Sequence, residues 1–557
     1  MKTRDWTNPG KDELLFVPLG GCGEIGMNLN LYGHNGSWLM VDCGVLFPGM
    51  KLPGVEVVTP NIEFALELGD RLAGLVLTHG HEDHLGAVPY LAEWLKCPIY
   101  ATSFTYHLLR AKLREDGVEV ADLREISQGA RFSCGAFGVE FVNLTHSIPE
   151  PNALLLETPL GAVFHTGDWK LDESPLLGED YDVARLQSLG DSGILAMVCD
   201  STNAMIAGRS GSEREARDGL IEMIAAEEGR IAVGCFASNV ARLDSIVRAA
   251  TKAGRRVALL GRSMQRVTNA ARDSGYLQGW PKIYDARALM SAPRDEVLYL
   301  CTGSQGESRA ALLRLAEGRH PMGRLESGDT VIFSSRVIPG NENEVYALQN
   351  RFVRGGIRVR TGEESRIHVS GHPCRDELAC LYEWVRPGCS VPVHGEARQQ
   401  AAHADLARGL GVPHGVVPEN GDVVRLAEGA PCCVGKVPSG RWAVEGLRLI
   451  DDGSSLYRER RKLGRGGIVY GCVVLDDRGR LLRRPRLWSC GVFSGESEGE
   501  DEARFGEHFE HLVEVMVERG GRGASDMGEE LRRKLGDWCK GDLGRVPRIN
   551  VMVMGDE

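Results

Sequence analysis

Short apolar runs that end abruptly at polar residues dominate the first two hundred positions of the chain. Aliphatic and aromatic side chains predominate in 72–77 (LAGLVL), 139–144 (VEFVNL) and 162–165 (AVFH). Runs of this length predict buried β-strands of a mixed sheet. A similar run, 39–41, leads directly into Asp42. Each predicted strand therefore ends where side chains capable of chemistry begin.

Farther along the chain, strands and helices alternate. Residues 229–236 predict a strand, 239–253 an amphipathic helix and 256–260 the next strand, and the apolar runs 295–301 and 330–334 continue the rhythm. A strand, helix, strand order indicates a parallel α/β unit.

Polar and charged residues set the last segment apart. The stretch 451–462, which includes a charged run, predicts a linker. Beyond it, the pattern predicts a strand at 467–475, a solvated acidic loop at 494–502, an amphipathic helix at 505–519 and a closing strand at 547–554. These elements predict a small α/β sheet domain.

Length and charge set outer bounds on this picture. A chain of 557 residues is too long for one ordinary core, and the element map predicts three structural units. The formal net charge of −12 argues weakly against binding of nucleic acid if the charge is spread uniformly over the surface. A local basic channel can nevertheless coexist with a negative exterior.

Cysteine usage and the chain start bear on location. Fifteen cysteines are scattered from Cys22 to Cys539 without a Cys-x-x-Cys pair. We interpret them as reduced and mostly buried. The first residues carry no apolar signal region, and no stretch reaches membrane-spanning length. We expect a cytoplasmic protein with no membrane partner.

The main candidate chemistry lies in residues 78–84, Thr-His-Gly-His-Glu-Asp-His, directly after a predicted strand. Neutral imidazoles and a carboxylate are ligands that Zn²⁺ prefers, and they suit Mn²⁺ when oxygen ligands are mixed in. His79 and His81 can close on one ion, which leaves Asp83 and His84 to face a second. Surface loops also collect such residues, but this spacing after a strand indicates a two-metal site.

Two later segments offer further ligands. His146 follows the predicted strand at 139–144, and Asp168 follows 162–165 and is placed to bridge two ions. Taken alone, either residue is more typical of a capped loop. Asp42 is better suited to orient a ligating histidine than to ligate an ion itself.

The series Asp42, His-x-His-x-Asp-His, His146 and Asp168 resembles the motifs of the metallo-β-lactamase superfamily over the first two hundred residues. The resemblance implies an αββα sandwich with metals at one edge. This superfamily hydrolyses lactams, thioesters and phosphodiesters, so the fold alone does not choose a substrate.

Three later segments resemble motifs A, B and C of the β-CASP nucleases: 200–203 (DSTN), 366–372 (RIHVSGH) and 392–396 (PVHGE). Together with 236–239 (FASN) and 302–306 (TGSQG), they are similar to the ribonuclease J family over roughly residues 10–450. The implied division is a metallo-β-lactamase domain at 1–208 and 367–450, an inserted β-CASP α/β domain at 209–366, a linker at 451–462 and a small C-terminal α/β domain at 463–557.

The resemblance also implies roles for single residues. His394 of motif C would complete the ligands of the second metal. Asp200 would hold ligand side chains in position without binding a metal itself. Asp83 and His368 would be catalytic, with His368 near the scissile phosphate for leaving-group protonation or charge stabilisation. Phe47 matches a position near the bound nucleotide, although a lone aromatic is more often packing.

A pocket for the RNA 5′-phosphate is implied between the turn at Ser238 and Asn239 and motif B. The residues that the resemblance places there from motif B are His368, Val369, Ser370, Gly371 and His372. Backbone amides at a helix start can hold a phosphate, whereas a plain helix cap at Ser238 explains the turn equally well from the residues alone. Arg242, Arg262, Arg266 and Arg336 are further candidate phosphate contacts.

The implied function is a metal-dependent ribonuclease with 5′-to-3′ exonuclease and endonuclease activity on single-stranded RNA, which leaves 5′-phosphate and 3′-hydroxyl ends and prefers 5′-monophosphate ends. Two divalent ions per subunit are expected, with zinc favoured and manganese open. Expected partners are mRNA and rRNA precursors, further copies in a homodimer or homotetramer, and an RNA-degradation complex.

Three alternatives remain. The large insert argues against a small-molecule metallohydrolase, and the complete ligand set argues against a nonhydrolytic RNA-binding scaffold. A DNA-directed β-CASP nuclease stays open because nothing in the sequence reads the 2′-hydroxyl directly.

Overall fold

The computed structural model describes residues 4–48, 52–120, 122–338, 340–362, 366–427, 429–446, 448–493, 498–520 and 524–555. The chain divides into two compact units, Met1–Phe47 with Val57–Val444, and Pro48–Glu56 with Glu445–Glu557. Among the helices in the described ranges, none is long and apolar enough to cross a membrane.

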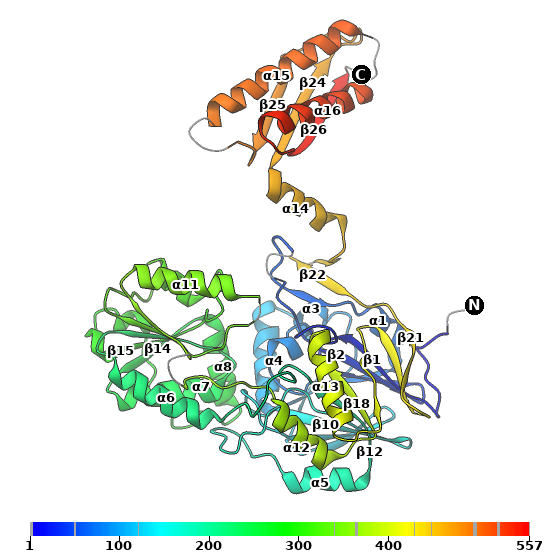
Figure 1. The fold of residues 1–557 in the computed structure, drawn as a ribbon, viewed down its shortest axis with the longest axis vertical. Coiled ribbons are helices and arrows are strands. Elements are labelled where there is room, and N and C mark those ends of the chain that lie inside the picture. Colours follow the sequence, from blue (N-terminus) through cyan, green and yellow to red (C-terminus); the bar gives the residue numbers. More distant parts are fainter. Residues whose placement is uncertain are drawn as a thin grey trace. The chain divides into compact units, whose positions relative to one another are not determined.

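Two sheets packed on each other form the centre of the larger unit (Figure 1). The first runs in the order β21 (Cys432–Lys436), β20 (Asp422–Ala427), β1 (Leu14–Gly20), β2 (Leu29–His34), β3 (Ser37–Val41), β5 (Leu72–Val76), β6 (Ile99–Thr102) and β7 (Leu123–Ile126). The second runs β19 (His414–Gly415), β18 (Cys389–Val393), β12 (Ile194–Asp200), β11 (Gly161–His165), β10 (Asn152–Thr158), β9 (Phe137–Asn143) and β8 (Arg131–Cys134).

Inward-facing side chains of both sheets make one apolar core, with Phe16 and Val76 from the first sheet meeting Phe141 and Val198 from the second. Helices cover the outer faces. On the second sheet these are α5 (Val183–Ser192), α12 (Arg375–Val385) and α13 (Ala397–Gly409), and on the first α1 (Glu63–Leu68) and α4 (Ser103–Asp116). The αββα prediction is confirmed.

Shorter elements complete this unit. They are β4 (Val58–Pro60), which pairs with β22 (Arg441–Glu445), and the helices α2 (Glu82–Leu85) and α3 (Val88–Leu91).

The inserted part is a five-stranded, wholly parallel sheet in the order β14 (Arg256–Leu260), β15 (Val297–Cys301), β13 (Ile231–Gly234), β16 (Thr330–Phe333) and β17 (Arg358–Arg360). Its helices are α6 (Glu213–Ala226), α7 (Val240–Lys252), α8 (Arg262–Asp273), α9 (Ala286–Leu289), α10 (Ala311–Ala316) and α11 (Glu342–Arg354). Helix α11 lies on one side of the sheet and α6 and α7 on the other (Figure 1). The predicted α/β rhythm is therefore present.

The smaller unit contains β23 (Arg448–Asp451), α14 (Ser455–Gly466) and the sheet β25 (Arg486–Cys490), β24 (Ile468–Leu475) and β26 (Arg548–Gly555), with helices α15 (Glu498–Arg519) and α16 (Ala524–Asp542). The apolar core of this sheet domain includes Val469, Phe509 and Leu531.

Two sequence expectations fail in the smaller unit. Most of the predicted linker at 451–462 is helical, because the Ser454 hydroxyl caps α14 by accepting from the Leu456 amide. Of the predicted acidic loop, 494–497 lies outside the described residues and 498–502 forms the first turns of α15. Acidic side chains favour a helix start, since they face its positive end.

Candidate metal and phosphate site

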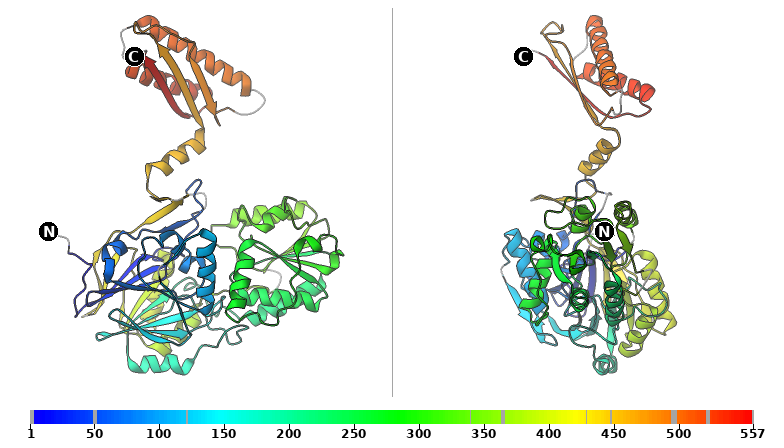
Figure 2. Two further views of the ribbon diagram at one scale, coloured as in Figure 1. Left: turned by 180° about the vertical axis from the view of Figure 1, so that it is seen from behind. Right: turned by 90° about the vertical axis from the view of Figure 1, so that its left-hand side faces the viewer.

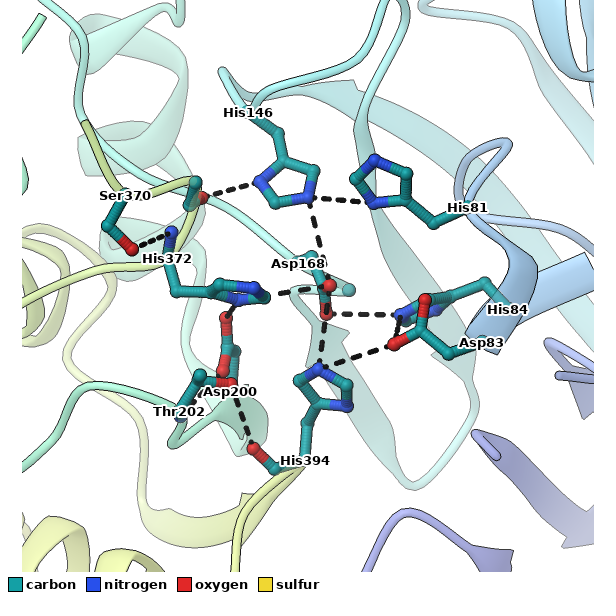
Figure 3. A network of polar contacts seen from close by, with 12 residues as sticks. His81, Asp83, His84, His146, Asp168, Asp200, Thr202, Ser370, His372 and His394 are labelled. Carbon is teal, nitrogen blue, oxygen red and sulfur yellow. Dashed lines mark hydrogen bonds and ion pairs between the residues drawn. The ribbon is translucent and has the colours of Figure 1, made fainter. Parts of the chain in front are cut away.

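The ends of strands from both sheets converge at one edge and carry the polar side chains there. Asp42 follows β3, Asp200 ends β12, and His394 follows β18. Strands β11, β12 and β18 run parallel, as do β3 and β5, so their carboxyl ends meet at the same edge of each sheet. Figure 3 shows the resulting cluster.

A first group joins His79, His81, His146 and Asp168, whose ligand atoms all lie within 4.8 Å of one another. His81 Nδ1 is 3.1 Å from both His79 Nε2 and His146 Nε2. Asp168 Oδ2 is 3.8 Å from each of those two Nε2 atoms. Three ring nitrogens and one carboxylate oxygen thus face a common centre.

A second group joins Asp83, His84, Asp168 and His394. His84 Nε2 lies 3.2 Å from Asp168 Oδ1 and 3.7 Å from Asp83 Oδ2. His394 Nε2 lies 3.6 Å from Asp168 Oδ2 and 3.7 Å from Asp83 Oδ2. Asp168 therefore belongs to both groups, as the sequence predicts, and every predicted ligand lies in one of them.

The donor set fits divalent cations. Asp168 Oδ1 and His394 Nε2 are buried without a hydrogen-bond partner, a state that costs free energy unless something else satisfies them. Burial lowers the pKa of His81 to about 4 and holds the pKa of His79 and His146 well below the ordinary value. Neutral imidazole is the form that binds metal.

Asp42 and Asn28 hold the ligand side chains in place. Asp42 Oδ2 accepts from His84 Nδ1 at 2.7 Å, and Oδ1 accepts from the Thr78 amide at 2.8 Å. Asn28 Oδ1 lies 2.9 Å from His394 Nδ1. Such partners fix the tautomer and orientation of ligating histidines. Sequence reasoning found Asp42 but missed Asn28, which no motif marks.

The backbone near these groups is unusual. Asp42 and His394 adopt positive φ values of 62° and 50°, a region that residues other than glycine seldom occupy. Such strain is typical of functional sites. It aims each side chain into the cluster.

Motif B reaches the metal groups through its backbone. The Gly371 carbonyl accepts from His146 Nδ1 at 2.5 Å. A Cβ at Gly371 would lie 2.7 Å from His146 Cε1, so only glycine fits at this distance. Gly371 thus orients a candidate metal ligand in addition to its predicted place in a phosphate pocket.

His372 lies nearer the metal groups than the sequence suggests. Its Nδ1 is 2.8 Å from Asp200 Oδ2 and 3.8 Å from Asp168 Oδ2, and with Asp200 and His394 it forms a third group of candidate ligands. Burial alone would lower the pKa of His372, but Asp200 and Asp168 raise it to about 9. The Ser370 hydroxyl accepts from Asn203 Nδ2 at 2.8 Å and from the His372 amide at 3.2 Å (Figure 3).

Arg242 is not a phosphate contact, contrary to the prediction. It is 1% exposed and pairs with Glu213, which is 2% exposed, at 3.0 Å. It also donates to the Ile367 carbonyl at 3.0 Å and to His368 Nδ1 at 3.3 Å. Burial, followed by the charge of Arg242, holds the pKa of His368 well below its ordinary value. A guanidinium therefore anchors motif B from inside the protein.

The turn before α7 differs in detail from the prediction. Its cap is Asn239, not Ser238: Asn239 Oδ1 accepts from the Arg242 amide at 2.8 Å, and Nδ2 donates to Glu213 at 3.1 Å. The Asn239 side chain is therefore fully engaged within the protein, while Ser238 is half-buried.

The two other predicted RNA contacts differ in exposure. Val369 is buried, and a Cβ on Gly211 would lie 3.0 Å from its side chain, so only the backbone of Val369 is available to a ligand. Phe47 is 63% exposed. It follows Leu46, whose side chain lies beside Gly26, as does the side chain of Asp83 on α2.

Comparison with known proteins gives four family matches along the chain. A β-lactamase superfamily domain matches residues 37–189, the ribonuclease J β-CASP domain 228–352, a Zn-dependent metallo-hydrolase RNA specificity domain 356–418 and the ribonuclease J C-terminal domain 456–555. Motifs A to C fall within or between these matches.

Relatives match over most of the chain. Ribonuclease J of Sinorhizobium meliloti is 45% identical over 494 residues, which cover 88% of each chain. Ribonuclease J of Mycolicibacterium smegmatis is 40% identical over 545 residues, which cover 96% of each chain.

One solved structure supports the fold alone. It is a protein of unknown function from Enterococcus faecalis, with a TM-score of 0.53 and 15% identity, and the match covers 74% of this chain and 100% of that one. Because the sequence motifs, the sandwich with its insert and the extended identity to these relatives agree, the chain belongs to the ribonuclease J family, nuclease hydrolases of the metallo-β-lactamase superfamily.

Proposed function

We propose that the protein cleaves single-stranded RNA both internally and from the 5′ end in the 5′-to-3′ direction, prefers 5′-monophosphate ends, and acts in RNA maturation and decay. The observation that carries this proposal is the sharing of Asp168 by two ligand groups directly beside motif B. One site then offers both phosphodiester hydrolysis and contacts for a terminal phosphate.

Two divalent ions fit the paired groups, with zinc favoured by their imidazoles. His79, His81, His146 and Asp168 would hold one ion, and Asp83, His84, Asp168 and His394 the other. Ions held in this way polarise phosphate oxygens and lower the pKa of a nucleophilic water.

His368 acts by charge stabilisation rather than by protonating the leaving group. Arg242 donates to its Nδ1, so the ring proton sits on Nε2 and the imidazole is neutral. Nε2–H can then donate to the charge that develops on the leaving oxygen. The low pKa makes a second ring proton unfavourable near neutral pH.

The 5′-phosphate is bound by motif B and the turn at Ser238. Ser370 Oγ already accepts from Asn203 and from the His372 amide, so its O–H is directed elsewhere and can donate to a phosphate oxygen. His372, whose Nδ1 is held 2.8 Å from Asp200 Oδ2, can donate to a phosphate oxygen from Nε2. Each internal cut leaves a new 5′-monophosphate that the same contacts can capture.

The test is decay of 3′-labelled single-stranded RNA that carries a 5′-monophosphate or a 5′-triphosphate. Faster decay of the monophosphate RNA, abolished by a chelator and in an Asp83→Ala, His84→Ala variant, supports the proposal. Ser370→Ala should remove the preference between the two ends and keep internal cleavage. Equal decay of both RNAs by the unaltered protein would contradict the terminal phosphate pocket.

We also propose a cytoplasmic location and self-association into a homodimer or homotetramer. All fifteen cysteines are free thiols, and ten of them are buried, which fits a reducing compartment. Mass measurement by light scattering tests the association.

A further inference from the structure

Within the described parts of residues 448–555, helices cover the C-terminal sheet on one face only. Helices α15 and α16 pack on one side of β25, β24 and β26, where Val469 and Val473 of β24 are buried against Phe509 and Leu535 (Figure 2). Successive residues of a strand point to opposite faces. Tyr470, Cys472 and Val474 therefore lie on the other face.

Two aromatic rings stand side by side on this open face. Tyr470 of β24 is directly opposite Trp488 of β25 in the antiparallel register. Their ring centroids are 5.9 Å apart with an interplanar angle of 30°. Tyr470 is 47% and Trp488 56% exposed. Large aromatic rings this exposed leave a flat apolar surface in water.

Two arginines of the neighbouring strands share the face of this pair. Arg486 is exposed and two residues from Trp488 on the same strand, which places it on the same face. On β26, Asn550 is opposite Tyr470 in register, and the exposed Arg548 two residues earlier shares its face.

The charge of this domain is asymmetric along the chain. Residues 458–486, which lead into and along the open sheet, carry ten Lys and Arg against three Asp and Glu. Helix α15, which covers the opposite face of the sheet, carries eight Asp and Glu against two Arg. Arg484 of this stretch pairs with Glu510 of α15. The cations of the three strands that share the face of the aromatic pair are Arg486 and Arg548, and Arg548 also lies 3.5 Å from Glu459.

We propose that the Tyr470–Trp488 face binds single-stranded RNA as a second site, apart from the metal groups. Bases stack on exposed aromatic side chains of open sheets, and neighbouring arginines attract the phosphates. If two copies of the chain met at this face, the arginines of one copy would lie near those of the other and repel them. Charge complementarity therefore favours a polyanion. The proposal rests on RNA being the substrate of this enzyme.

The expected effect follows from stacking. Each lost stack weakens binding by about 5- to 100-fold. Because both side chains are exposed, their replacement leaves the apolar core of the domain untouched. Trp488→Phe retains a ring and is expected to keep most of the affinity.

The experiment measures fluorescence anisotropy of labelled single-stranded polyuridine with the full-length, chelator-treated protein, so that no cleavage occurs. Tyr470→Ala, Trp488→Ala should bind at least 5-fold more weakly, and Arg486→Ala should reduce the dependence on salt. Trp94→Ala, which removes an aromatic side chain that is 44% exposed in the other unit, is the matched control and should bind as the unaltered protein does.

Cleavage of a short RNA, too short to occupy a second site, separates this inference from the proposed function. The double variant should retain that cleavage, which depends on the metal groups alone. Unchanged polyuridine affinity in the double variant would overturn the second site. If the double variant also had a lower mass in solution, the face would be identified as a contact between copies of the chain. Absence of RNA cleavage by the unaltered protein would instead refute the proposed function.

Discussion

His403 should make the catalytic unit less stable as the pH falls. It lies on α13, is fully buried, and places Nδ1 2.9 Å from Ser201 Oγ and Nε2 2.9 Å from Tyr382 Oη. Burial lowers its pKa from 6.5 to about 4. Ser201 directly follows Asp200, so this contact supports the chain beside the metal groups.

The direction of this pH dependence follows from the protonation of His403 in the unfolded and the native protein. Below pH 6.5 the unfolded chain takes up a proton at His403, whereas the native protein stays unprotonated until about pH 4. The stability that His403 supplies is therefore complete above pH 6.5 and is lost progressively as pH falls through this interval. The loss amounts to about 2 kcal/mol at pH 5 and about 3 kcal/mol below pH 4.

His403→Gln removes the proton uptake and keeps a neutral polar side chain. Its cost near neutral pH should be about 1 kcal/mol from altered hydrogen bonding, but its unfolding free energy should fall about 2 kcal/mol less than that of the unaltered protein between about pH 7 and about pH 5. Urea unfolding of the metal-free protein measures this. Hydrogen exchange of peptides from β18 and α13 reports the unfolding of the catalytic unit separately from that of the C-terminal unit.

His414→Gln is the matched control, because the side chain of His414 is exposed and should leave the pH dependence unchanged. Parallel pH dependences for His403→Gln and the unaltered protein would refute the reasoning.

Three further changes test the site. Asp42→Asn should lower metal affinity about 10- to 100-fold by releasing the histidine that Asp42 orients, as measured by competition with a chromogenic chelator. Arg242→Met should destabilise the protein by about 3–5 kcal/mol, because Glu213 would remain buried and unpaired; Arg242→Met with Glu213→Leu should recover part of this in chemical denaturation. Gly371→Ala should displace His146 and lower bound metal measured by mass spectrometry, and full occupancy would contradict the close contact.

The local features of the site could be predicted from the sequence. The ligands of 79–84 lie within six residues directly after a strand, so their spacing alone predicts a metal group. Asp168 and His146 follow strands of their own, and the resemblance to the superfamily's series of motifs marks them as ligands. Chemistry that short segments encode is visible without a fold.

Contacts between distant segments could not be predicted. Asn28 and His394 are 366 positions apart, and His146 and Gly371 are 225 apart. No periodicity links such pairs. Arg242 was mistaken for a phosphate contact because arginine usually lies at a surface, and only the tertiary structure supplies the buried Glu213 that pairs with it.

The residue that caps α7 could not be chosen from the sequence for a related reason. Both Ser and Asn are good helix caps, and the choice of Asn239 over Ser238 depends on Glu213, which arrives from another helix and accepts from the Asn239 side chain.

The distances in sequence between these partners have a consequence for synthesis of the enzyme. The second ligand group lacks His394 until nearly four hundred residues have been made, and His146 lacks its Gly371 partner until the inserted domain is complete. A growing or prematurely ended chain therefore carries the first histidines without a finished catalytic centre. The order of the sequence therefore places completion of the second ligand group late in synthesis.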